Sequence, residues 1–209
     1  CEIVFDAIRG RDPLDSTSLN HEYNMQDNKY KIQDLRIGIP NEYFTEGIDA
    51  KVEQVIRDAI HKLEQAGAKI EEITLPHTKY ALAAYYLINT SEASANLARY
   101  DGMRYGESGM KNKELQTKNL LDVYLSTRGE NLGAEVKRRI MLGTYALSAG
   151  YYEAYYLKAL KIRTLLKQDF DSAFQKVDVI MGPVSPFLPF KIGEKVENPL
   201  SMYLVDIYT

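Results

Sequence analysis

The chain has 209 residues, of which 45% are hydrophobic and 26% are charged, and its formal net charge at pH 7 is −3. These proportions exclude an intrinsically disordered chain and favour one large domain with a core. A net negative charge supplies no positive field for a phosphate backbone, which argues against direct binding of nucleic acid. No apolar run reaches the roughly 20 residues that cross a bilayer. The single Cys1 cannot form an internal disulfide, which fits a cytoplasmic protein.

The first eight residues predict a helix, because their apolar side chains fall on one face and Gly10 follows as a C-terminal cap. The next segment, GRDPLDSTS, predicts turns, since Asp15 and its neighbours can bind nearby backbone N–H groups. No Met precedes the helix, so we expect the chain to be part of a longer protein.

A strand, a helix and a second strand follow one another from residue 35 to residue 76. LRIGIP (35–40) alternates apolar and other residues up to a proline, and AKIEEITLP (68–76) resembles it. Between them Asp49 predicts the N-cap of an amphipathic helix that Gly67 ends. Short connections between such elements indicate a βαβ unit with parallel strands, which places the chain in the α/β class.

The remainder of the chain is mainly helical in pattern. A helix is predicted over 79–104 with Gly102 as its stop, and a weak helical stripe lies within 106–130. Residues 135–174 predict one long helix or two helices with a kink. Within 177–186 the sequence predicts a buried strand that ends at Gly-Pro.

Candidate nucleophiles and metal ligands are sparse. His21, His61 and His77 have no second histidine or cysteine at metal-ligand spacing, so we interpret them as surface residues and predict no metal site. No serine stands in a GxSxG elbow and no Gly-rich phosphate loop is present. The sequence therefore predicts no catalytic residue in this chain.

An arginine stands where a charged segment meets a long uncharged one, in EVKRRIMLGTYALSAGYYEAYY (135–156). On a helix, Arg139 shares a face with three small residues, Gly143, Ala146 and Gly150. Such a face admits either another backbone or a ligand. From the residues alone, tight helix packing with Arg139 paired to a buried carboxylate and a binding role for Arg139 both remain open.

A carboxylate in an apolar run is the second unusual charge. Asp206 lies between Val205 and Ile207, and a charge in such surroundings is costly unless it is paired or hydrogen-bonded. An arginine and an aspartate of this kind suit either an internal ion pair or the two ends of a zwitterion such as an amino acid.

Five blocks also carry a resemblance to a known family. They are IRGRDPLDST (8–17), SEASANLARYDGMRYG (91–106), the arginine-containing block 135–156, VDVIMGPVSP (177–186) and NPLSMYLVDIYT (198–209). They closely resemble the amidase signature family and, within it, the A subunits of the tRNA-dependent amidotransferases. The resemblance covers essentially the whole chain.

The resemblance implies a fold and a boundary. It implies an α/β fold with a mixed β-sheet flanked by helices, of which residues 1–209 form a single partial domain, the C-terminal half. The family's Ser–cis-Ser–Lys triad lies in and before a Gly/Ser-rich segment, and no such run occurs here. We therefore expect the chain alone to be inactive.

The resemblance further implies the hydrolysis of glutamine, whose ammonia converts Glu-tRNA(Gln) to Gln-tRNA(Gln). The partners implied are the B and C subunits, with tRNA met only indirectly through the complex and no membrane. No cofactor is implied for this chain, since ATP and Mg are used by a partner in the complex.

The resemblance also implies a substrate site. The substrate-binding positions carried over are Tyr85, which lines the pocket, Arg139 for the α-carboxylate and Asp206 for the α-ammonium. On this interpretation the small face beside Arg139 admits the substrate, and the apolar remainder of the 135–156 block is core. A stand-alone amidase of the same family and a noncatalytic α/β binding domain are the alternatives.

Overall fold

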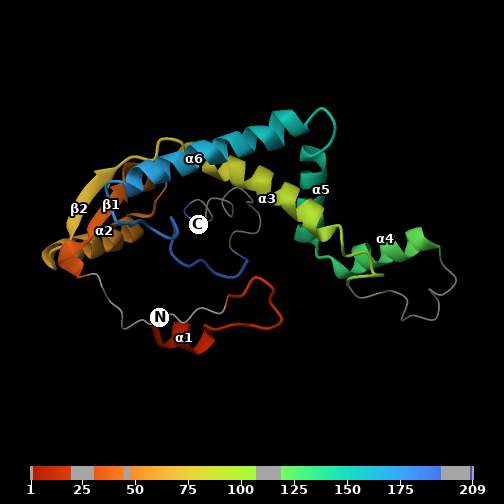
Figure 1. Cartoon of the computed structure of the whole chain (residues 1–209), viewed down its shortest axis with the longest axis horizontal. Coiled ribbons are helices and arrows are strands. Elements are labelled where there is room, and N and C mark those ends of the chain that lie inside the picture. The colour runs from red at the N-terminus through yellow and green to blue at the C-terminus, as the bar shows by residue number, and fades with distance from the viewer. Residues whose placement is uncertain (1, 20–30, 45–47, 107–118, 194–207, 209) are drawn as a thin grey trace.

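The computed structural model describes residues 2–19, 31–44, 48–106, 119–193 and 208. The longer helices are α1 (Glu2–Ile8), α2 (Ala50–Gln65), α3 (Ala81–Leu97), α4 (Leu120–Asn131), α5 (Ala134–Ala146) and α6 (Lys158–Phe174), and a π-helix, η6 (Tyr152–Leu157), precedes α6. Three short 3-10 helices are η1 (Ile32–Asp34), η2 (Asn41–Phe44) and η3 (Thr78–Tyr80). The strands are β1 (Arg36–Pro40), β2 (Lys69–Ile73) and β3 (Val179–Ile180). Figure 1 shows the sheet at one end of the molecule and the long helices extending from it.

The described strands form one sheet in the order β2-β1-β3. β1 pairs in parallel with β2 from Arg36↔Lys69 to Pro40↔Ile73, and in parallel with β3 through two residues. The predicted βαβ unit is therefore confirmed, as is the α/β class. Both pairings within the described residues are parallel. The order predicted within 177–186, a strand and then Gly-Pro, is confirmed, but the strand covers only Val179–Ile180 and is not buried, since Val179 is 39% exposed.

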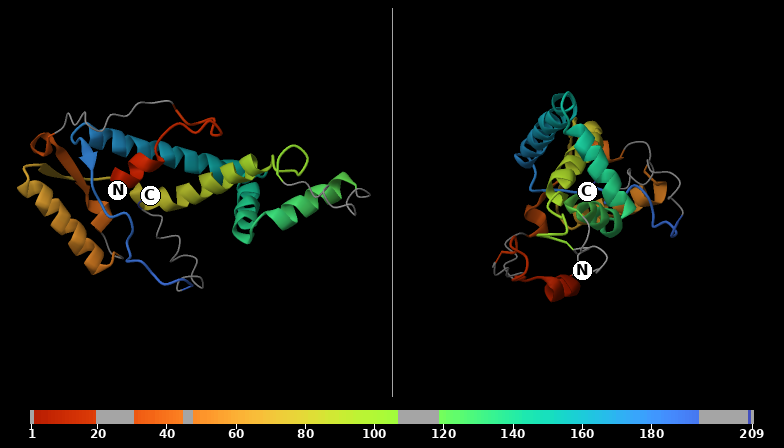
Figure 2. Two further views of the ribbon diagram at one scale, coloured as in Figure 1. Left: turned by 90° about the horizontal axis from the view of Figure 1, so that it is seen from below. Right: turned by 90° about the vertical axis from the view of Figure 1, so that its right-hand side faces the viewer.

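Two hydrophobic clusters cover the two faces of the sheet. On one face Ile37 and Ile39 of β1 pack against α2 through Ile60 and Leu63. On the other face the buried residues are Ile73, Leu75, Ala173 and Val177, which brings α6 onto the sheet. The alternation along β1 places Gly38 on the α6 face, where a Cβ would lie 2.8 Å from the Ile73 side chain. The result is a layer of sheet between helices (Figure 2).

The ends of α2 are determined by the residues that the sequence indicated. The Asp49 side chain accepts a hydrogen bond from the backbone N–H of Lys51 at 2.8 Å, as an N-cap residue does. At the other end Gly67 has a φ of +104°, in the region that favours glycine. Both predictions are confirmed.

The segment from 134 to 174 is two helices with a sharp break, which confirms the kinked version of the prediction. α5 ends at Ala146, and Gly150 adopts a φ of +84° in the turn before η6. After that turn α6 runs back along α3 toward the sheet (Figure 1).

The segment from 79 to 106 was predicted as a longer helix than is observed. α3 ends at Leu97, and the Asp101 carboxylate accepts hydrogen bonds from the backbone N–H groups of Met103 and Arg104. That carboxylate builds a turn in which Gly102 has a φ of +79°. The helix therefore ends one turn earlier than the position of the glycine suggests.

Two helices lie away from the sheet. The apolar side chains of α1 are exposed, with Ile3 exposed to 86%, and α4 projects at the end opposite the sheet in both Figure 1 and Figure 2. None of the helices in the described ranges is long and apolar enough to cross a membrane.

Candidate functional site

The site is built where α5 crosses α3 at very short range. A Cβ added to Gly143 would lie 1.9 Å from the backbone oxygen of Thr90, so the two backbones touch. Next to this contact the hydroxyl groups of Ser94 and Thr144 are hydrogen-bonded at 2.9 Å. The small-residue face of α5 therefore admits a helix.

This contact corrects the expectation that the small face admits the substrate. Gly143 and Ala146 are buried at the crossing, so backbone packing is the correct interpretation of that face. Gly150 does not belong to the face, because it lies beyond the end of α5 and no atom comes within 4 Å of its added Cβ.

Arg139 extends from α5 toward α3 one turn before the crossing. Its Nε donates to Glu135 Oε1 at 3.0 Å, and its guanidinium carbon lies 5.9 Å from the centre of the Tyr86 ring. The hydrogen bond to Glu135 is the main cause that raises the pKa of Arg139, and a hydrogen bond to Tyr85 adds to the same rise. The Arg139 side chain remains 30% exposed.

The buried ion pair considered for Arg139 is not what the structure shows, because Glu135 is itself exposed at the start of α5. Glu135 also pairs with Arg138, whose side chain is the more exposed of the two arginines. The carboxylate thus holds one edge of the Arg139 guanidinium and leaves terminal N–H groups for other partners.

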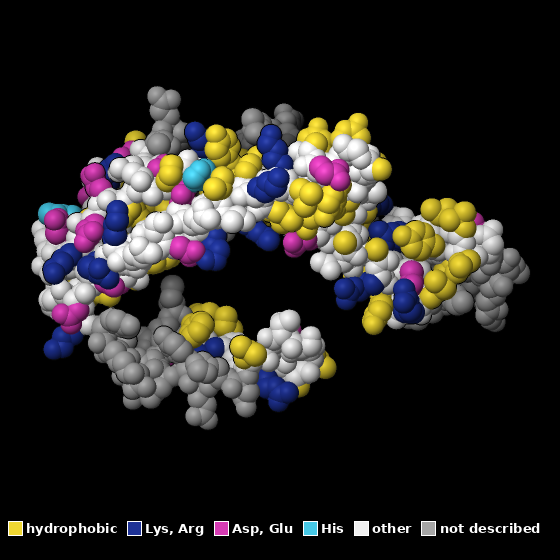
Figure 3. Space-filling model, turned by 45° about the horizontal axis from the view of Figure 1, so that its top comes forward, with side chains coloured by type: hydrophobic (Ala, Val, Ile, Leu, Met, Phe, Trp, Pro, Cys, Tyr) yellow, Lys and Arg dark blue, Asp and Glu magenta, His cyan; other side chains and the backbone are white. Residues whose placement is uncertain are grey.

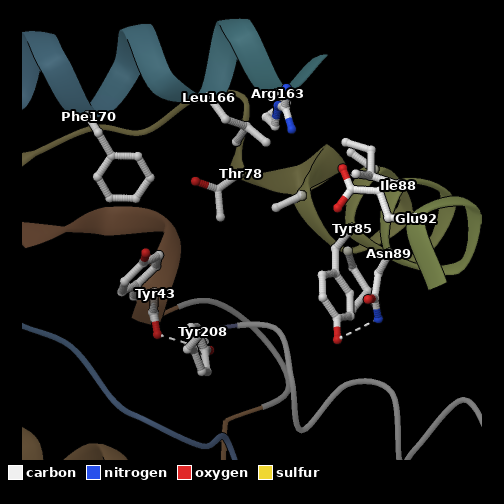
Figure 4. A pocket seen from close by; sticks show the side chains of 13 residues that line it. Tyr43, Thr78, Tyr85, Ile88, Asn89, Glu92, Arg163, Leu166, Phe170 and Tyr208 are labelled. Atoms are coloured by element: carbon white, nitrogen blue, oxygen red, sulfur yellow. Dashed lines mark hydrogen bonds between the residues drawn. The ribbon is translucent and has the colours of Figure 1, made fainter. Parts of the chain in front are cut away.

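Tyr85, next to Tyr86 on α3, lies near enough to Arg139 to add to the rise of its pKa. Its hydroxyl oxygen also accepts a hydrogen bond from Nδ2 of Asn89 at 3.2 Å, one turn further along the same helix. Figure 4 shows Tyr85 and Asn89 on one side of α3, joined by this bond. The structure therefore brings together two of the three predicted substrate-binding residues.

A cavity of about 450 Å³ lies beside Tyr85. Its walls come from η2, η3, α3, α6 and the residue near the C-terminus: Tyr43, Thr78, Ala81, Leu82, Ala84, Tyr85, Ile88, Asn89, Glu92, Arg163, Leu166, Phe170 and Tyr208. Arg139 does not line it. Tyr85 thus lines the cavity and also lies near the Arg139 guanidinium.

Asp206 lies outside the described residues, so its predicted role is untested. Tyr208, two residues further on, lines the cavity and donates from its hydroxyl to the backbone oxygen of Tyr43 at 3.2 Å. The two rings also meet edge to face, with their centres 5.1 Å apart. These contacts bring Tyr208 to the same cavity as Tyr85 (Figure 4).

The expectation that the apolar remainder of the 135–156 block is core is wrong for the described structure. Met141 is 73% exposed, and Tyr145 is 51% exposed. Tyr145 and Tyr151 pack against one another with ring centres 4.4 Å apart, and a hydrogen bond to Tyr151 is the main cause that raises the pKa of Tyr145 to about 12. The tyrosines therefore pack on one another at the surface of the α5 to η6 corner.

Two of the three histidines lie in the described ranges. His61 is exposed, and its ring nitrogens contact Glu64 and Gln65 on α2. His77 contacts the largely buried carboxylate of Asp169 at 3.0 Å, which ties the end of β2 to α6. In the described part of the chain, no group of three or more metal-ligating side chains comes together.

The comparisons with known proteins identify the family of the chain. The family model described as "Amidase" matches residues 1–209. The chain belongs to the amidase family. Asn89, which contacts the Tyr85 hydroxyl, was missed by sequence reasoning, although its position four residues after Tyr85 on a helix was a usable signal.

The relatives of this chain include the A subunits of several glutamyl-tRNA(Gln) amidotransferases. The A subunit of the Carboxydothermus hydrogenoformans enzyme is 55% identical over 209 residues, which are 99% of this chain and 42% of the relative. The A subunit of the Thermoanaerobacter pseudethanolicus enzyme is 54% identical over 211 residues. That match covers 100% of this chain and 42% of the relative.

A solved structure supports the same fold. The crystal structure of the glutamyl-tRNA(Gln) amidotransferase A subunit of Thermotoga maritima matches with a TM-score of 0.65 and 33% identity, and the match covers 99% of this chain and 39% of that one. The chain therefore spans about 40% of the length of the proteins it matches.

Proposed function

We propose that this chain is the part of a glutamyl-tRNA(Gln) amidotransferase A subunit that binds glutamine. The observation that carries the proposal is the 55% identity over 99% of the chain to a protein of that name. Identity at this level along the whole chain supports a shared substrate as well as a shared fold.

The geometry of the α3–α5 crossing supports the same substrate. Arg139 and Tyr85 meet from different helices, and both can donate hydrogen bonds to one ligand. A guanidinium whose orientation is already determined by Glu135 and the Tyr86 ring suits the planar α-carboxylate of an amino acid. In this proposal Asp206 holds the α-ammonium.

The chain supplies binding in this proposal, and the rest of the whole protein supplies the chemistry. No serine of the chain stands in a Gly/Ser-rich run, so the nucleophile that attacks the side-chain amide belongs to the remainder of that protein. The ammonia released would pass to the B and C subunits, where ATP and Mg serve to activate Glu-tRNA(Gln).

A test uses the whole amidotransferase of Carboxydothermus hydrogenoformans, with this chain in place of the matching segment of the A subunit. Arg139→Ala removes a charge-assisted contact to the carboxylate, so kcat/KM for glutamine should fall about 10- to 150-fold. Amidation supported by added ammonia should be nearly unchanged, because ammonia does not need this site. Both rates are measured as Gln-tRNA(Gln) formed.

Arg138→Ala is the matched control, because it removes the adjacent arginine that shares Glu135 but faces solvent. It should leave both rates unchanged. A second substrate, 4-aminobutanamide, lacks the α-carboxylate, and its turnover should not respond to Arg139→Ala. Equal loss of the glutamine- and ammonia-dependent rates, or a well-folded but inactive graft, would contradict the proposal.

A further inference from the structure

The hydroxyl of Tyr85 already accepts a hydrogen bond and still has its proton to donate. A phenolic hydroxyl has two acceptor positions and one proton to donate. Asn89 Nδ2 donates to the oxygen at 3.2 Å, and the Arg139 guanidinium lies beside the neighbouring Tyr86 ring, 5.9 Å from its centre. With the Asn89 N–H directed at one side of the oxygen, the hydroxyl proton points away from Asn89, where a ligand can accept it.

Asn89 carries no charge, and in this arrangement it contacts the Tyr85 hydroxyl and not the carboxylate itself. It lies one turn after Tyr85 on the cavity side of α3, and Glu92 continues the same stripe. Without a donor beside it, the Tyr85 hydroxyl could rotate its proton toward or away from the ligand. The bond from Asn89 removes that freedom.

We propose that Asn89 is a positioning residue that fixes the Tyr85 hydroxyl as a hydrogen-bond donor to the carboxylate bound by Arg139. The inference rests on the proposed function, since it assigns the neighbouring group of the same site. This arrangement makes the site selective for ligands that accept hydrogen bonds. A carboxylate meets two donors, Arg139 and the Tyr85 hydroxyl, whereas a ligand N–H at the same place meets no acceptor.

Two substitutions separate this role from simple packing. Asn89→Leu keeps the side-chain size but lets the hydroxyl rotate. Asn89→Asp provides an acceptor, toward which the Tyr85 proton would turn, and it also adds a negative charge near the carboxylate. We expect KM for glutamine to rise about five- to tenfold in Asn89→Leu and more in Asn89→Asp, with kcat within about twofold in Asn89→Leu.

The test is a double-mutant cycle with Tyr85→Phe in the whole amidotransferase, with glutamine and 4-aminobutanamide as substrates. If Asn89 acts through the hydroxyl, Asn89→Leu has no further effect on KM once Tyr85 is phenylalanine. KM for 4-aminobutanamide should not respond to Asn89→Leu. Asn96→Leu is the matched control, since Asn96 is an exposed asparagine of α3 that does not line the cavity.

The outcomes distinguish the two proposals. If Arg139→Ala raises KM for glutamine but Asn89→Leu does not, only the role of Asn89 is overturned. If Arg139→Ala leaves KM for glutamine unchanged, the proposed binding of glutamine by Arg139 is overturned, whatever the result for Asn89→Leu. Additive effects of Asn89→Leu and Tyr85→Phe, or equal losses with both substrates, would show that Asn89 only supports the packing of α3.

Discussion

One aspartate connects the first and last strands of the described sheet. Asp178 accepts a hydrogen bond from the backbone N–H of Arg36 at 2.9 Å, and its other oxygen lies 2.7 Å from Arg36 Nη2. The side-chain hydrogen bonds from Arg36 are the main cause that lowers the pKa of Asp178 to about 2. Bonds to the ionised form thus join two segments that are far apart in the chain.

The stability of the chain should depend on this carboxylate in a defined pH range. A lowered pKa means that the folded state favours the ionised form, so the stabilisation is present above the ordinary value of 3.8 and is lost as pH falls toward 2. Asp178→Asn should therefore lower the urea midpoint near pH 6 but much less near about pH 2.5.

The control for Asp178 is Asp58→Asn, which removes the same charge from α2, where the carboxylate accepts only a side-chain bond from Gln54 among the described contacts. It should change the midpoint little at either pH. If Asp178→Asn lowered the urea midpoint by the same amount at both pH values, the stabilisation would not come from the ionised Asp178 carboxylate.

At the scale of the elements, the crossing of α3 and α5 determines where the site residues lie. The closest approach, at Thr90 and Gly143, is about one turn from Tyr85 on one helix and from Arg139 on the other. A small change in this approach would therefore move the guanidinium relative to the tyrosine hydroxyl. The packing contact and the proposed binding site therefore share the same two helices.

Gly143→Ala tests the crossing. The added Cβ would fall 1.9 Å from a backbone oxygen, so the helices must separate, and the free energy of unfolding should fall by about 1–3 kcal/mol or more. In a chain of this size the melting temperature should drop by about 2–4 °C for each kcal/mol. Differential scanning fluorimetry or calorimetry measures the shift.

Gly129→Ala is the matched control, because it makes the same change within α4, where no atom lies within 4 Å of the added Cβ. Alanine favours a helix over glycine by about 0.5–1 kcal/mol, so this variant should be unchanged or slightly more stable. Similar melting temperatures for the two variants would mean that α5 is not pressed against α3.

At the scale of the whole molecule, large apolar side chains lie at the surface far from the sheet. On α4, Leu120, Leu121 and Leu125 are exposed, and Figure 3 shows hydrophobic side chains gathered over that end. The apolar residues of α1 are exposed as well. Contiguous exposed apolar surface of this kind promotes association.

We expect the isolated chain to self-associate as its concentration rises. Light scattering over a concentration series should show a growing mean mass, and Leu121→Glu combined with Leu125→Glu should reduce it, because the charges make burial of that surface costly. Lys167→Glu, a charge change on an exposed site of α6, should not reduce it. A chain that remains monomeric throughout the series would contradict this prediction.

The parts of the fold that were predictable are those determined by local chemistry. Asp49 and Gly67 bound α2 through a cap and a positive φ, which need no tertiary contact, and the alternation in 35–40 predicted β1. The early end of α3 was not predictable, because it depends on how the Asp101 carboxylate folds back on the next residues.

The candidate site was predictable only in part. Arg139 was singled out by its place in the sequence pattern and Tyr85 through a resemblance, and the two lie near each other in the structure. The small residues beside Arg139 fit a ligand or a helix equally well, and only the position of Thr90, about fifty residues earlier, distinguishes the two. Asn89 was missed because its contact with the Tyr85 hydroxyl depends on how the two side chains are oriented along α3.

The contact between Gly143 and Thr90 has an evolutionary consequence. A side chain larger than hydrogen at 143 would need the opposing helix to shift, and that shift would move the Arg139 guanidinium one turn away, the group proposed to bind the carboxylate. Selection for a folded helix pair and selection for substrate affinity therefore act on the same few positions. Among functional descendants of this chain, changes at 90, 94, 143 and 144 should occur in combination, and a library that randomises these four positions should yield active members only as co-adapted sets.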